Sequence, residues 1–163
     1  MKEGNPESIG DKSAGNWKRI LVPTDLSERS RSAVRAATYL AEQCGAKVTL
    51  LHVVQLYSGS LETGMAADHF MNLARESLDK IADDIPPALM GEKLVALGPE
   101  GTFQKIIETA HELSSDLIVV ATHSYGPIRR ALLGSLAISV IRHAPCAVLV
   151  VSPDSLQMKH SII

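Results

Sequence analysis

Short apolar segments alternate with amphipathic segments along this chain, and this alternation limits the possible folds more than any other feature of the sequence. Five segments are nearly continuous in apolar and β-branched residues, as strands buried on both faces are, and they cover residues 19–23, 47–54, 93–97, 117–121 and 147–151. Between them, apolar residues recur every three or four positions, which predicts helices over about 28–44, 65–81, 102–113 and 134–143. Such strict alternation predicts an α/β fold with a five-stranded, parallel, open sheet and helices on both faces.

Residues with the chemistry of helix boundaries stand close to the expected helix ends. We expect Ser27 to cap the first helix, because a serine hydroxyl accepts a hydrogen bond from a first-turn N–H group. Gly45 would end that helix, since glycine readily adopts a left-handed conformation. Thr102 can cap the third helix. The second helix is expected to carry Phe70, Leu73, Leu78 and Ile81 on or near one face.

The length of 163 residues is that of one domain with its own core. Residues 1–16 are polar and contain three glycines, and residues 154–163 are again polar. We therefore expect a flexible leader, a domain over 17–153 and a polar tail. The leader lacks the apolar core of a secretory signal, which favours a cytoplasmic location. In that compartment Cys44 and Cys146 would stay reduced.

Composition argues against several classes of partner. Sixteen Lys+Arg against 18 Asp+Glu give a formal net charge of −2, so no overall field attracts nucleic acid or anionic lipid. Aromatic residues make up 4% of the chain, too few for a surface that stacks single-stranded bases. No segment of the sequence reaches the ~18 consecutive apolar residues of a membrane helix. We therefore expect neither a nucleic-acid partner nor a membrane.

Signatures of catalysis and metal binding are missing from the sequence. No two of the six histidines lie within five residues of each other, so no helix carries a pair of metal ligands. Residues 59–64 have the glycine spacing of a phosphate loop, but Met65 and Ala66 stand where Lys and Ser or Thr are required. Cys146 stands at the start of a buried strand, which favours packing over nucleophilic chemistry. We expect no catalytic residue and no metal bound by the protein itself.

The most informative stretch, residues 121–135, leads from the fourth apolar segment into the last helix. Ligands of open parallel sheets bind at the carboxyl ends of strands, which selects this stretch and the loops after Pro23 and Val53. The stretch enters the helix at Gly134-Ser135, where unpaired N–H groups and the helix dipole favour an anion such as phosphate. Ser135 could cap the helix or bind a phosphate oxygen. From the residues alone, a turn and a helix start without a ligand explain the stretch equally well.

The same stretch resembles the signature of the universal stress protein family, Gly-x2-Gly-x9-Gly-(Ser/Thr). The resemblance covers about 18–153 and follows the family's order through Ile-Leu-Val-Pro-Thr-Asp-Leu-Ser at 20–27, Leu-Leu-His-Val-Val at 50–54, Asp-Leu-Ile-Val-Val at 116–120, Leu-Leu-Gly-Ser at 132–135 and Pro-Cys-Ala-Val-Leu-Val-Val at 145–151. It implies the adenine nucleotide α-hydrolase-like variant of the Rossmann-like fold.

The signature is incomplete in this chain. Counted back from Gly134, the two earlier glycines fall on Ser124 and Ala121, so only the last of the three is kept. Side chains at these two positions could crowd a phosphate or ribose, and a left-handed serine would cost roughly 1–2 kcal/mol. Gly126 lies two positions after Ser124 and can absorb part of the backbone demand. Because the family contains members that hold ATP and members that lack the signature and do not, both outcomes stay open.

In family members that bind ATP, the adenine and ribose lie near the first two strand ends, and the phosphates lie along the loop and helix start. Carried over by position, the resemblance implies a nucleotide site made of Pro23, Thr24, Asp25, Val53, Ala121, Thr122, His123, Ser124, Gly126, Arg129, Gly134, Ser135 and Leu136. The ligand would be ATP or AMP, with Mg²⁺ bound only through the nucleotide. Simpler roles compete at four positions, namely turn formation by Asp25, core packing by Val53, a loop hydrogen bond by His123 and solvation of Arg129.

The resemblance also implies how the chain acts. By the family's strand order the last segment is an edge strand, and since apolar edges tend to pair, we expect a homodimer formed through it. Its residues are Ala147, Val148, Leu149, Val150 and Val151. Cover of this edge by the leader or the tail is the competing explanation.

The expected function is that of a homodimeric switch in the stress response, which binds an adenine nucleotide and changes the surface offered to an unknown protein partner. Two alternatives remain. One is a family member that binds no nucleotide and acts purely through protein interactions. The other is a weak nucleotide hydrolase with slow turnover.

Overall fold

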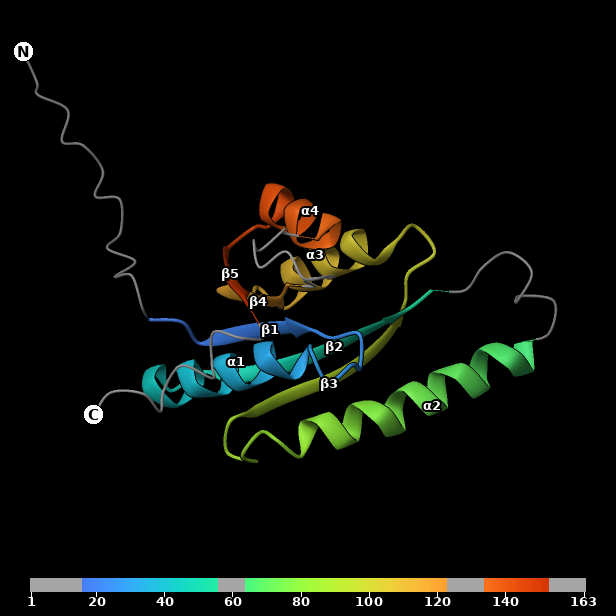
Figure 1. Ribbon diagram of the computed structural model, residues 1–163, viewed down its shortest axis with the longest axis horizontal. Coiled ribbons are helices and arrows are strands. Elements are labelled where there is room, and N and C mark those ends of the chain that lie inside the picture. The colour runs from blue at the N-terminus through green and yellow to red at the C-terminus, as the bar shows by residue number, and fades with distance from the viewer. Residues whose placement is uncertain (1–15, 56–63, 123–133, 153–163) are drawn as a thin grey trace, which may run out of the picture.

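The structure, a computed structural model, describes residues 16–55, 64–122 and 134–152. Its strands are β1 (Arg19–Pro23), β2 (Lys47–Val54), β3 (Met90–Leu97), β4 (Leu117–Ala121) and β5 (Ala147–Val151). Its helices are α1 (Arg31–Cys44), α2 (Gly64–Ala82), α3 (Thr102–Glu112) and α4 (Ser135–His143). Strands and helices alternate strictly, as predicted (Figure 1). The predicted leader, apart from Asn16, and the predicted tail lie outside the described residues.

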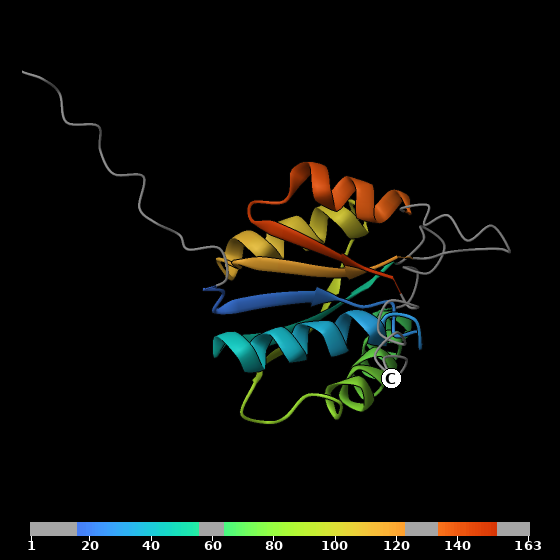
Figure 2. The ribbon, with the colours of Figure 1, turned by 60° about the vertical axis from the view of Figure 1, so that its left-hand side comes forward.

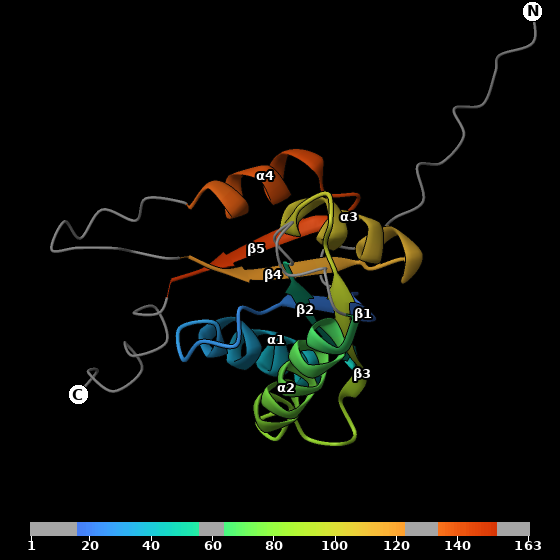
Figure 3. The ribbon, with the colours of Figure 1, turned by 90° about the vertical axis from the view of Figure 1, so that its right-hand side faces the viewer.

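All five strands are parallel and lie in the order β3-β2-β1-β4-β5. The chain starts in the middle of the sheet, moves outward to β3, and then returns to the other side of β1 for β4 and β5. The strand order therefore reverses between β1 and β4, which is where open sheets of this kind bind ligands. Figure 3 shows α1 and α2 on one face of the sheet and α3 and α4 on the other. The predicted fold class is confirmed.

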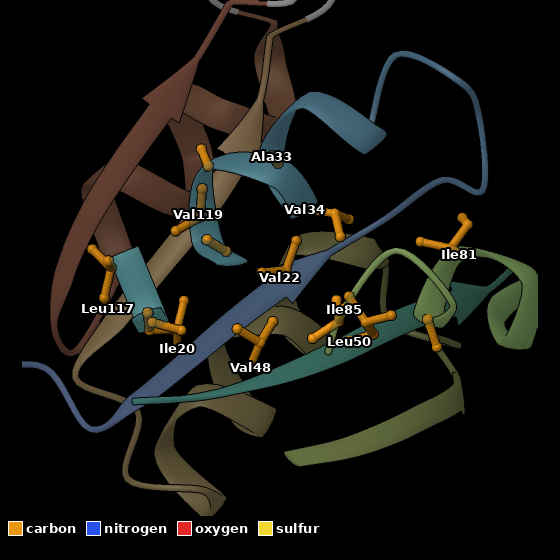
Figure 4. Close-up of a cluster of buried hydrophobic side chains, with 14 of the residues drawn as sticks. Ile20, Val22, Ala33, Val34, Val48, Leu50, Ile81, Ile85, Leu117 and Val119 are labelled. Carbon is orange, nitrogen blue, oxygen red and sulfur yellow. The ribbon is translucent and has the colours of Figure 1, made fainter. Parts of the chain in front are cut away.

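Two apolar cores hold the layers together, one on each face of the sheet. Successive residues of β1 point to opposite cores, so that Ile20 and Val22 pack on the side of α1 and α2 while Leu21 packs against α3 and α4. Figure 4 shows the first core, in which Val22 lies among Val34 of α1 and Leu50 of β2. Burial of each of these side chains stabilises the fold by roughly 1.5–3 kcal/mol. Because both faces of the sheet are covered, its inner strands are apolar almost throughout.

The start of α1 differs from the prediction. Ser30, not Ser27, directly precedes the first residue of the helix, and the Ser30 N–H donates to the Ser27 carbonyl in a turn. The reason is that the N–H and hydroxyl of Ser27 both bind the Asp25 carboxylate, at 3.0 and 2.5 Å, which closes a loop before the helix begins. The predicted end of α1 is confirmed, because Gly45 has a left-handed φ of 63° and its N–H donates to Ala41.

The starts of α3 and α4 are each one residue from the predicted cap. Glycines take both N-cap positions, Gly101 before α3 and Gly134 before α4. Thr102 and Ser135 are therefore the first helical residues and not the caps. Neither helix has a side-chain hydrogen bond at its cap in the described part of the chain, so first-turn N–H groups remain available there.

The predicted start of β3 is also corrected. β3 begins at Met90 and not at position 93, because Met90 pairs with Val48 ahead of a register shift that interrupts the apolar pattern. On α2, Phe70 and Leu73 are 48% and 46% exposed, whereas Leu78 and Ile81 are buried in the first core. None of the helices in the described residues combines the length and the apolar composition that a membrane span requires.

Candidate functional site

A pocket opens at the carboxyl ends of β1, β2 and β4, where α3 and α4 begin. In Figure 2 the arrows of β1, β4 and β5 point to the right, and both helices start on that side. The described walls are formed by Pro23, Thr24, Asp25, Ser30, Leu51, Val53, Thr102, Ile106, Val120, Ala121 and Leu136. The pocket therefore lies where the strand order reverses.

The pocket walls are mainly apolar. Leu51 and Val53 come from β2, Val120 comes from β4, and α4 adds Leu136, whose side chain is large, apolar and 38% exposed. Such walls suit a flat, apolar ring system. Among the described lining side chains, the only one with a charge is Asp25, which is exposed. The described pocket can thus enclose an apolar ring and accept hydrogen bonds beside it.

Hydroxyl groups shape the loop between β1 and α1. The buried hydroxyls of Thr24 and Ser30 lie 2.7 Å apart. The Leu26 N–H donates to Oγ1 of Thr24 at 3.0 Å, and Oγ of Ser30 donates to the Ser27 carbonyl at 2.8 Å. Ser27 in turn donates to the Asp25 carboxylate. These bonds hold Leu26 in a left-handed conformation with a φ of 64° and place Thr24 and Asp25 on the pocket.

β2 anchors the same loop from the neighbouring strand. The Thr24 N–H donates to the Leu51 carbonyl at 2.9 Å, which continues the pairing of β1 with β2 by one residue. Nδ1 of the half-buried His52 lies 2.9 Å from the Thr24 carbonyl. Since a carbonyl can only accept, Nδ1 of His52 carries the proton and donates it. The backbone of Thr24 is therefore fixed on both sides, and Asp25 follows it directly.

The start of α4 leaves space where a ligand can approach the helix. Gly134 has an ordinary extended backbone, with φ −61° and ψ 154°. A Cβ atom at Gly134 would meet no described atom within 4 Å. Within the described residues, neither backbone conformation nor packing requires a glycine at this position. A glycine does allow close approach of a ligand to the first-turn N–H groups, where the positive end of the helix dipole lies.

The structure brings together many, but not all, of the predicted site residues. Six of them line the pocket, namely Pro23, Thr24, Asp25, Val53, Ala121 and Leu136. Gly134 and Ser135 stand at the adjoining start of α4. His123, Ser124, Gly126 and Arg129 lie outside the described residues. Thr122 does not line the pocket, because its N–H and hydroxyl donate to the Val151 carbonyl at 2.8 and 3.5 Å and tie β4 to β5.

Ala121 takes the place of the first signature glycine without backbone strain. It is the last residue of β4 and pairs with Val151 of β5. The described non-glycine residues with positive φ are Leu26 and Ser114, so Ala121 has the ordinary conformation of a strand residue. Glycine is therefore not required by the backbone at this position. What Ala121 adds is a methyl group on the pocket wall.

Five lining residues were not predicted, namely Ser30, Leu51, Thr102, Ile106 and Val120. Strand alternation with Val53 could have marked Leu51, because the two side chains point to the same face of β2. Helical spacing could have marked Ile106 once Thr102 was chosen, since residues four apart share a helix face. No pattern marks Ser30, because its place in the pocket depends on a contact with Thr24.

The described walls offer little for covalent chemistry. Ser27 donates its hydroxyl to Asp25 but does not itself line the pocket. Cys146 is also absent from the described lining and packs against the second core. Burial, together with the nearby Asp116 carboxylate, raises the pKa of the Cys146 thiol. The thiolate that a nucleophilic cysteine needs is therefore disfavoured.

Comparisons with known proteins match nearly the whole described chain. A family model described as "Universal stress protein family" matches residues 16–152. A Staphylococcus aureus (strain USA300) protein named "Putative universal stress protein" is 28% identical over 146 residues, which are 86% of this chain and 87% of that protein. In structure, a universal stress protein family member from Burkholderia pseudomallei superposes with a TM-score of 0.67 at 24% identity, covering 85% of this chain and 98% of that one.

Two further solved structures share the fold. One is a universal stress protein in complex with cAMP, with a TM-score of 0.61 and 24% identity over 85% of this chain and 98% of that one. The other is the Archaeoglobus fulgidus universal stress protein in complex with dAMP, with a TM-score of 0.53 and 23% identity over 83% of this chain and 98% of that one. The fold is thus the adenine nucleotide α-hydrolase-like one. With the family model matched from before β1 through the end of β5, this chain belongs to the universal stress protein family.

Proposed function

We propose that this protein binds an adenine nucleotide, ATP or AMP, in the pocket at the carboxyl end of the sheet. One observation carries the proposal. Residues chosen from three separate strand ends and a helix start converge on a single apolar pocket, although they are far apart in sequence. The cAMP and dAMP held by two relatives of the same fold support an adenine nucleotide as the class of ligand.

The chemistry of the walls suggests how the nucleotide lies. The adenine ring is apolar and flat and fits between the aliphatic side chains of Leu51, Val53 and Leu136. Phosphates are anions and suit the start of α4, where, among the described residues, Gly134 leaves room and no side chain caps the first-turn N–H groups. Mg²⁺ is then held by the phosphates and not by a cage of protein ligands. Ser135 and the loop residues His123, Ser124, Gly126 and Arg129 are proposed to complete the phosphate side.

We further propose that two copies pair through β5, and the contrast between the two sheet edges supports this. β5 is short and wholly apolar, and Leu149 is 37% exposed on it. β3, the other edge, carries exposed Glu92 and Lys93 and a register shift, both of which hinder strand pairing. The β5 edge is thus the one suited to antiparallel pairing about a twofold axis. Leu149→Asp should convert the dimer to a monomer in size-exclusion chromatography with light scattering, while Lys93→Asp should leave it intact.

In this proposal the protein is a binding module and not a turnover enzyme. The nucleotide biases the dimer between two states, which present different surfaces to a protein partner during the stress response in the cytoplasm. Such a switch requires a ligand that binds one state more tightly than the other. Any hydrolysis of ATP would be slow, because no nucleophile beside a base lines the described part of the pocket.

A thermal-shift experiment tests nucleotide binding directly. Saturating Mg·ATP or AMP should raise Tm by several degrees, because a ligand at 100 times its Kd adds about 2.7 kcal/mol of stability. GTP and Mg²⁺ alone are the controls. Gly134→Val should keep the Tm of the unliganded protein, since the described structure has room for the side chain, but should lose the shift. Arg142→Ala, on the last turn of the same helix, should keep both.

Each outcome points to one function. The absence of a shift with ATP and AMP would overturn nucleotide binding and favour a family member that acts through protein interactions alone. Phosphate release from Mg·ATP that disappears in Gly134→Val would instead support the weak hydrolase. A phosphate release that survives this variant would come from a contaminant.

A further inference from the structure

The hydroxyl group of Thr102 differs from the other two hydroxyl groups on the described pocket wall, which belong to Thr24 and Ser30. Oγ of Ser30 donates its single proton to the Ser27 carbonyl at 2.8 Å, so in its 2.7 Å contact with Thr24 it must accept. The Thr24 hydroxyl is therefore the donor in that contact. Oγ1 of Thr102, by contrast, accepts from Nε2 of Gln55 at 2.8 Å, and no described residue takes its proton.

Gln55 fixes the direction of the Thr102 hydroxyl. It follows the last residue of β2, and its side chain is exposed and outside the described lining of the pocket. An amide nitrogen can only donate, so the contact has one possible direction, and the hydroxyl oxygen uses one of its two lone pairs in it. The proton of Thr102 then points away from Gln55. Thr102 is left as a hydrogen-bond donor on the pocket wall.

The surroundings of Thr102 suit a flat, neutral ring. Ile106 stands one turn further along α3, on the same face of the helix, and also lines the pocket. Ile106 packs in the second core with Leu51 and Val53 of β2, which line the pocket as well. Thr102 is therefore a single hydroxyl group beside an aliphatic wall, where one hydrogen bond can orient a ring that is otherwise held by apolar contact.

The start of α3, unlike that of α4, is shielded from a phosphate. A Cβ atom at Gly101 would lie 2.5 Å from Oε1 of Gln104, so the amide of Gln104 folds back over the first turn. This oxygen is buried and has no hydrogen-bond partner among the described residues. Its partial negative charge repels a phosphate. A Cβ atom at Gly134 would meet no described atom within 4 Å. The phosphates thus suit the start of α4, and a neutral part of the nucleotide suits Thr102.

The neutral part that depends on a donor from the protein is the base. The ring nitrogens of adenine accept hydrogen bonds, whereas the ribose hydroxyls carry protons of their own. Asp25 can only accept, and the protons of Thr24 and Ser30 are already used. We propose that the Thr102 hydroxyl, oriented by Gln55, donates a hydrogen bond to a ring nitrogen of adenine and so helps to select the base. This inference rests on the proposed nucleotide site and gives the start of α3 a role beyond that of a helix terminus.

The test measures, by calorimetry on the full chain, the affinities for AMP and for its 1-deaza, 3-deaza and 7-deaza analogues. In each analogue a C–H group replaces one ring nitrogen, so one acceptor is lost. Thr102→Val removes the hydroxyl, keeps the shape of the side chain, and should weaken AMP about fivefold, as expected for one hydrogen bond. One analogue should bind the wild type more weakly than AMP does and should lose nothing further in Thr102→Val. Thr102→Ser should restore the wild-type pattern.

Gln55 is a positioning residue in this proposal, and Gln55→Glu tests that role. A carboxylate can only accept, so Thr102 would donate its proton to the new side chain and lose it for the ligand. The affinity for AMP relative to that of the responsive analogue should fall about fivefold, to a ratio close to one. A merely structural role of Gln55, or repulsion between the new charge and the phosphate, would weaken both ligands equally and leave the ratio unchanged.

Thr109→Val is the matched control, because it makes the same substitution in the same helix. The Thr109 hydroxyl donates to the Lys105 carbonyl at 2.8 Å and lies outside the described lining, so all four affinities should be kept. An AMP affinity that survives Thr102→Val, or an equal loss for AMP and all three analogues, would overturn the inference while leaving nucleotide binding in place. A wild type that binds neither AMP nor any analogue would overturn the nucleotide site itself.

Discussion

The two ends of the sheet use the same residue type for different purposes. At the amino end, the Asp116 carboxylate accepts the backbone N–H groups of Lys18 and Arg19, each at 2.9 Å, and the Arg19 guanidinium at 3.3 Å. At the carboxyl end, the Asp25 carboxylate accepts from Ser27 and stands exposed beside the pocket. One aspartate joins two strands, and the other stands where a ligand can reach it. The role of an aspartate next to a strand thus depends on which end of the strand it occupies.

The helix termini at the amino end of the sheet also differ from those at its carboxyl end. α1 and α3 finish at the amino end, where Gly45 and Ser114 close them in left-handed conformations. α3 and α4 begin at the carboxyl end with Gly101 and Gly134, and neither has a capping side chain in the described part. Backbone groups are paired within the protein at the amino end, whereas at the carboxyl end the described residues leave first-turn N–H groups of α3 and α4 without a capping side chain. Substitutions at the amino end should therefore change stability, and those at the carboxyl end should change binding.

The largest effect is expected when the same substitution is made at both ends. Asp116→Ala leaves the N–H groups of Lys18 and Arg19 and the Arg19 guanidinium without their acceptor and should cost about 2–3 kcal/mol of unfolding free energy. Asp25→Ala, at an exposed position, should cost less than about 1 kcal/mol. Urea unfolding can be followed through Trp17, the only tryptophan of the chain, which packs against the first core. Similar losses in the two variants would remove the distinction between the two ends.

Asp116 should make the free energy of unfolding depend on pH. Burial raises its pKa, but the N–H groups of Lys18 and Arg19 and the charge of Arg19 together outweigh this and hold it below the ordinary 3.8. Because the folded protein holds this proton more weakly than the unfolded chain, Asp116 stabilises the fold at any pH above that ordinary pKa of the unfolded chain. That contribution is lost as pH falls through the lower folded pKa.

Unfolding free energies of the wild type and Asp116→Asn should therefore differ by about 1–2 kcal/mol at pH 7. The difference should narrow steadily once the pH falls below about 4. Asp25→Asn serves as the comparison at the other end of the sheet. A difference between wild type and Asp116→Asn that stays constant down to pH 2.5 would show that the charge of Asp116 is not what stabilises the amino end.

At the carboxyl end, the informative change is one that alters binding and leaves stability alone. Ala121→Val adds two methyl groups to the pocket wall and should weaken AMP about tenfold, equivalent to about 1.4 kcal/mol. The free energy of unfolding should change by less than about 0.5 kcal/mol, since valine suits a strand. Calorimetry and urea unfolding of the same sample measure both quantities. An unchanged affinity of Ala121→Val for AMP would place the ligand away from Ala121. Gly45→Ala, at the opposite end of the sheet, is the control and should leave the affinity for AMP unchanged.

The sequence alone predicts most of the fold because the inner strands are apolar on both faces. β1, β2, β4 and β5 match their predicted limits to the residue. β3 begins earlier than predicted, at Met90, because a register shift at an exposed edge leaves no periodic pattern. Limits of helices are harder to predict, since Ser27 has the chemistry of a cap but is bound to Asp25 instead.

The site is only partly predictable for a related reason. The rule that ligands bind at the strand-order reversal selects the loops after Pro23, Val53 and Ala121, and the resemblance to the family then adds Asp25 by position. Ser30 and the left-handed Leu26 cannot be found this way, because the shape of their loop follows from hydroxyl contacts made only after folding. Pattern rules describe regular elements, whereas this loop is set by individual donors and acceptors.

The smallest changes in stability are expected at the ends of α1 and α3, where a residue with a left-handed backbone closes each helix in the same geometry. Gly45 has a φ of 63° and Ser114 a φ of 48°. In each case the N–H of the next residue reaches back five positions to a carbonyl, from Ala46 to Ala41 at 3.0 Å and from Ser115 to Ala110 at 2.8 Å. The motif needs a left-handed residue, and glycine is the one that adopts it without a side-chain penalty. The chain thus carries the favourable residue at one helix end and an unfavourable one at the other.

Removing the glycine at one helix end should therefore lower the free energy of unfolding, and introducing a glycine at the other should raise it. Gly45→Ala should cost about 1 kcal/mol, and the cost is conformational, because the nearest atom to the added Cβ would be Nζ of Lys18 at 3.9 Å. Ser114→Gly should add about 0.5 kcal/mol, since the relief of strain exceeds the extra freedom that glycine gives to the unfolded chain. Urea unfolding measures both, and the double variant should show the sum of the two changes. A loss of stability in Ser114→Gly would mean that the serine side chain itself supports the amino end, and that its left-handed backbone is not a weakness there.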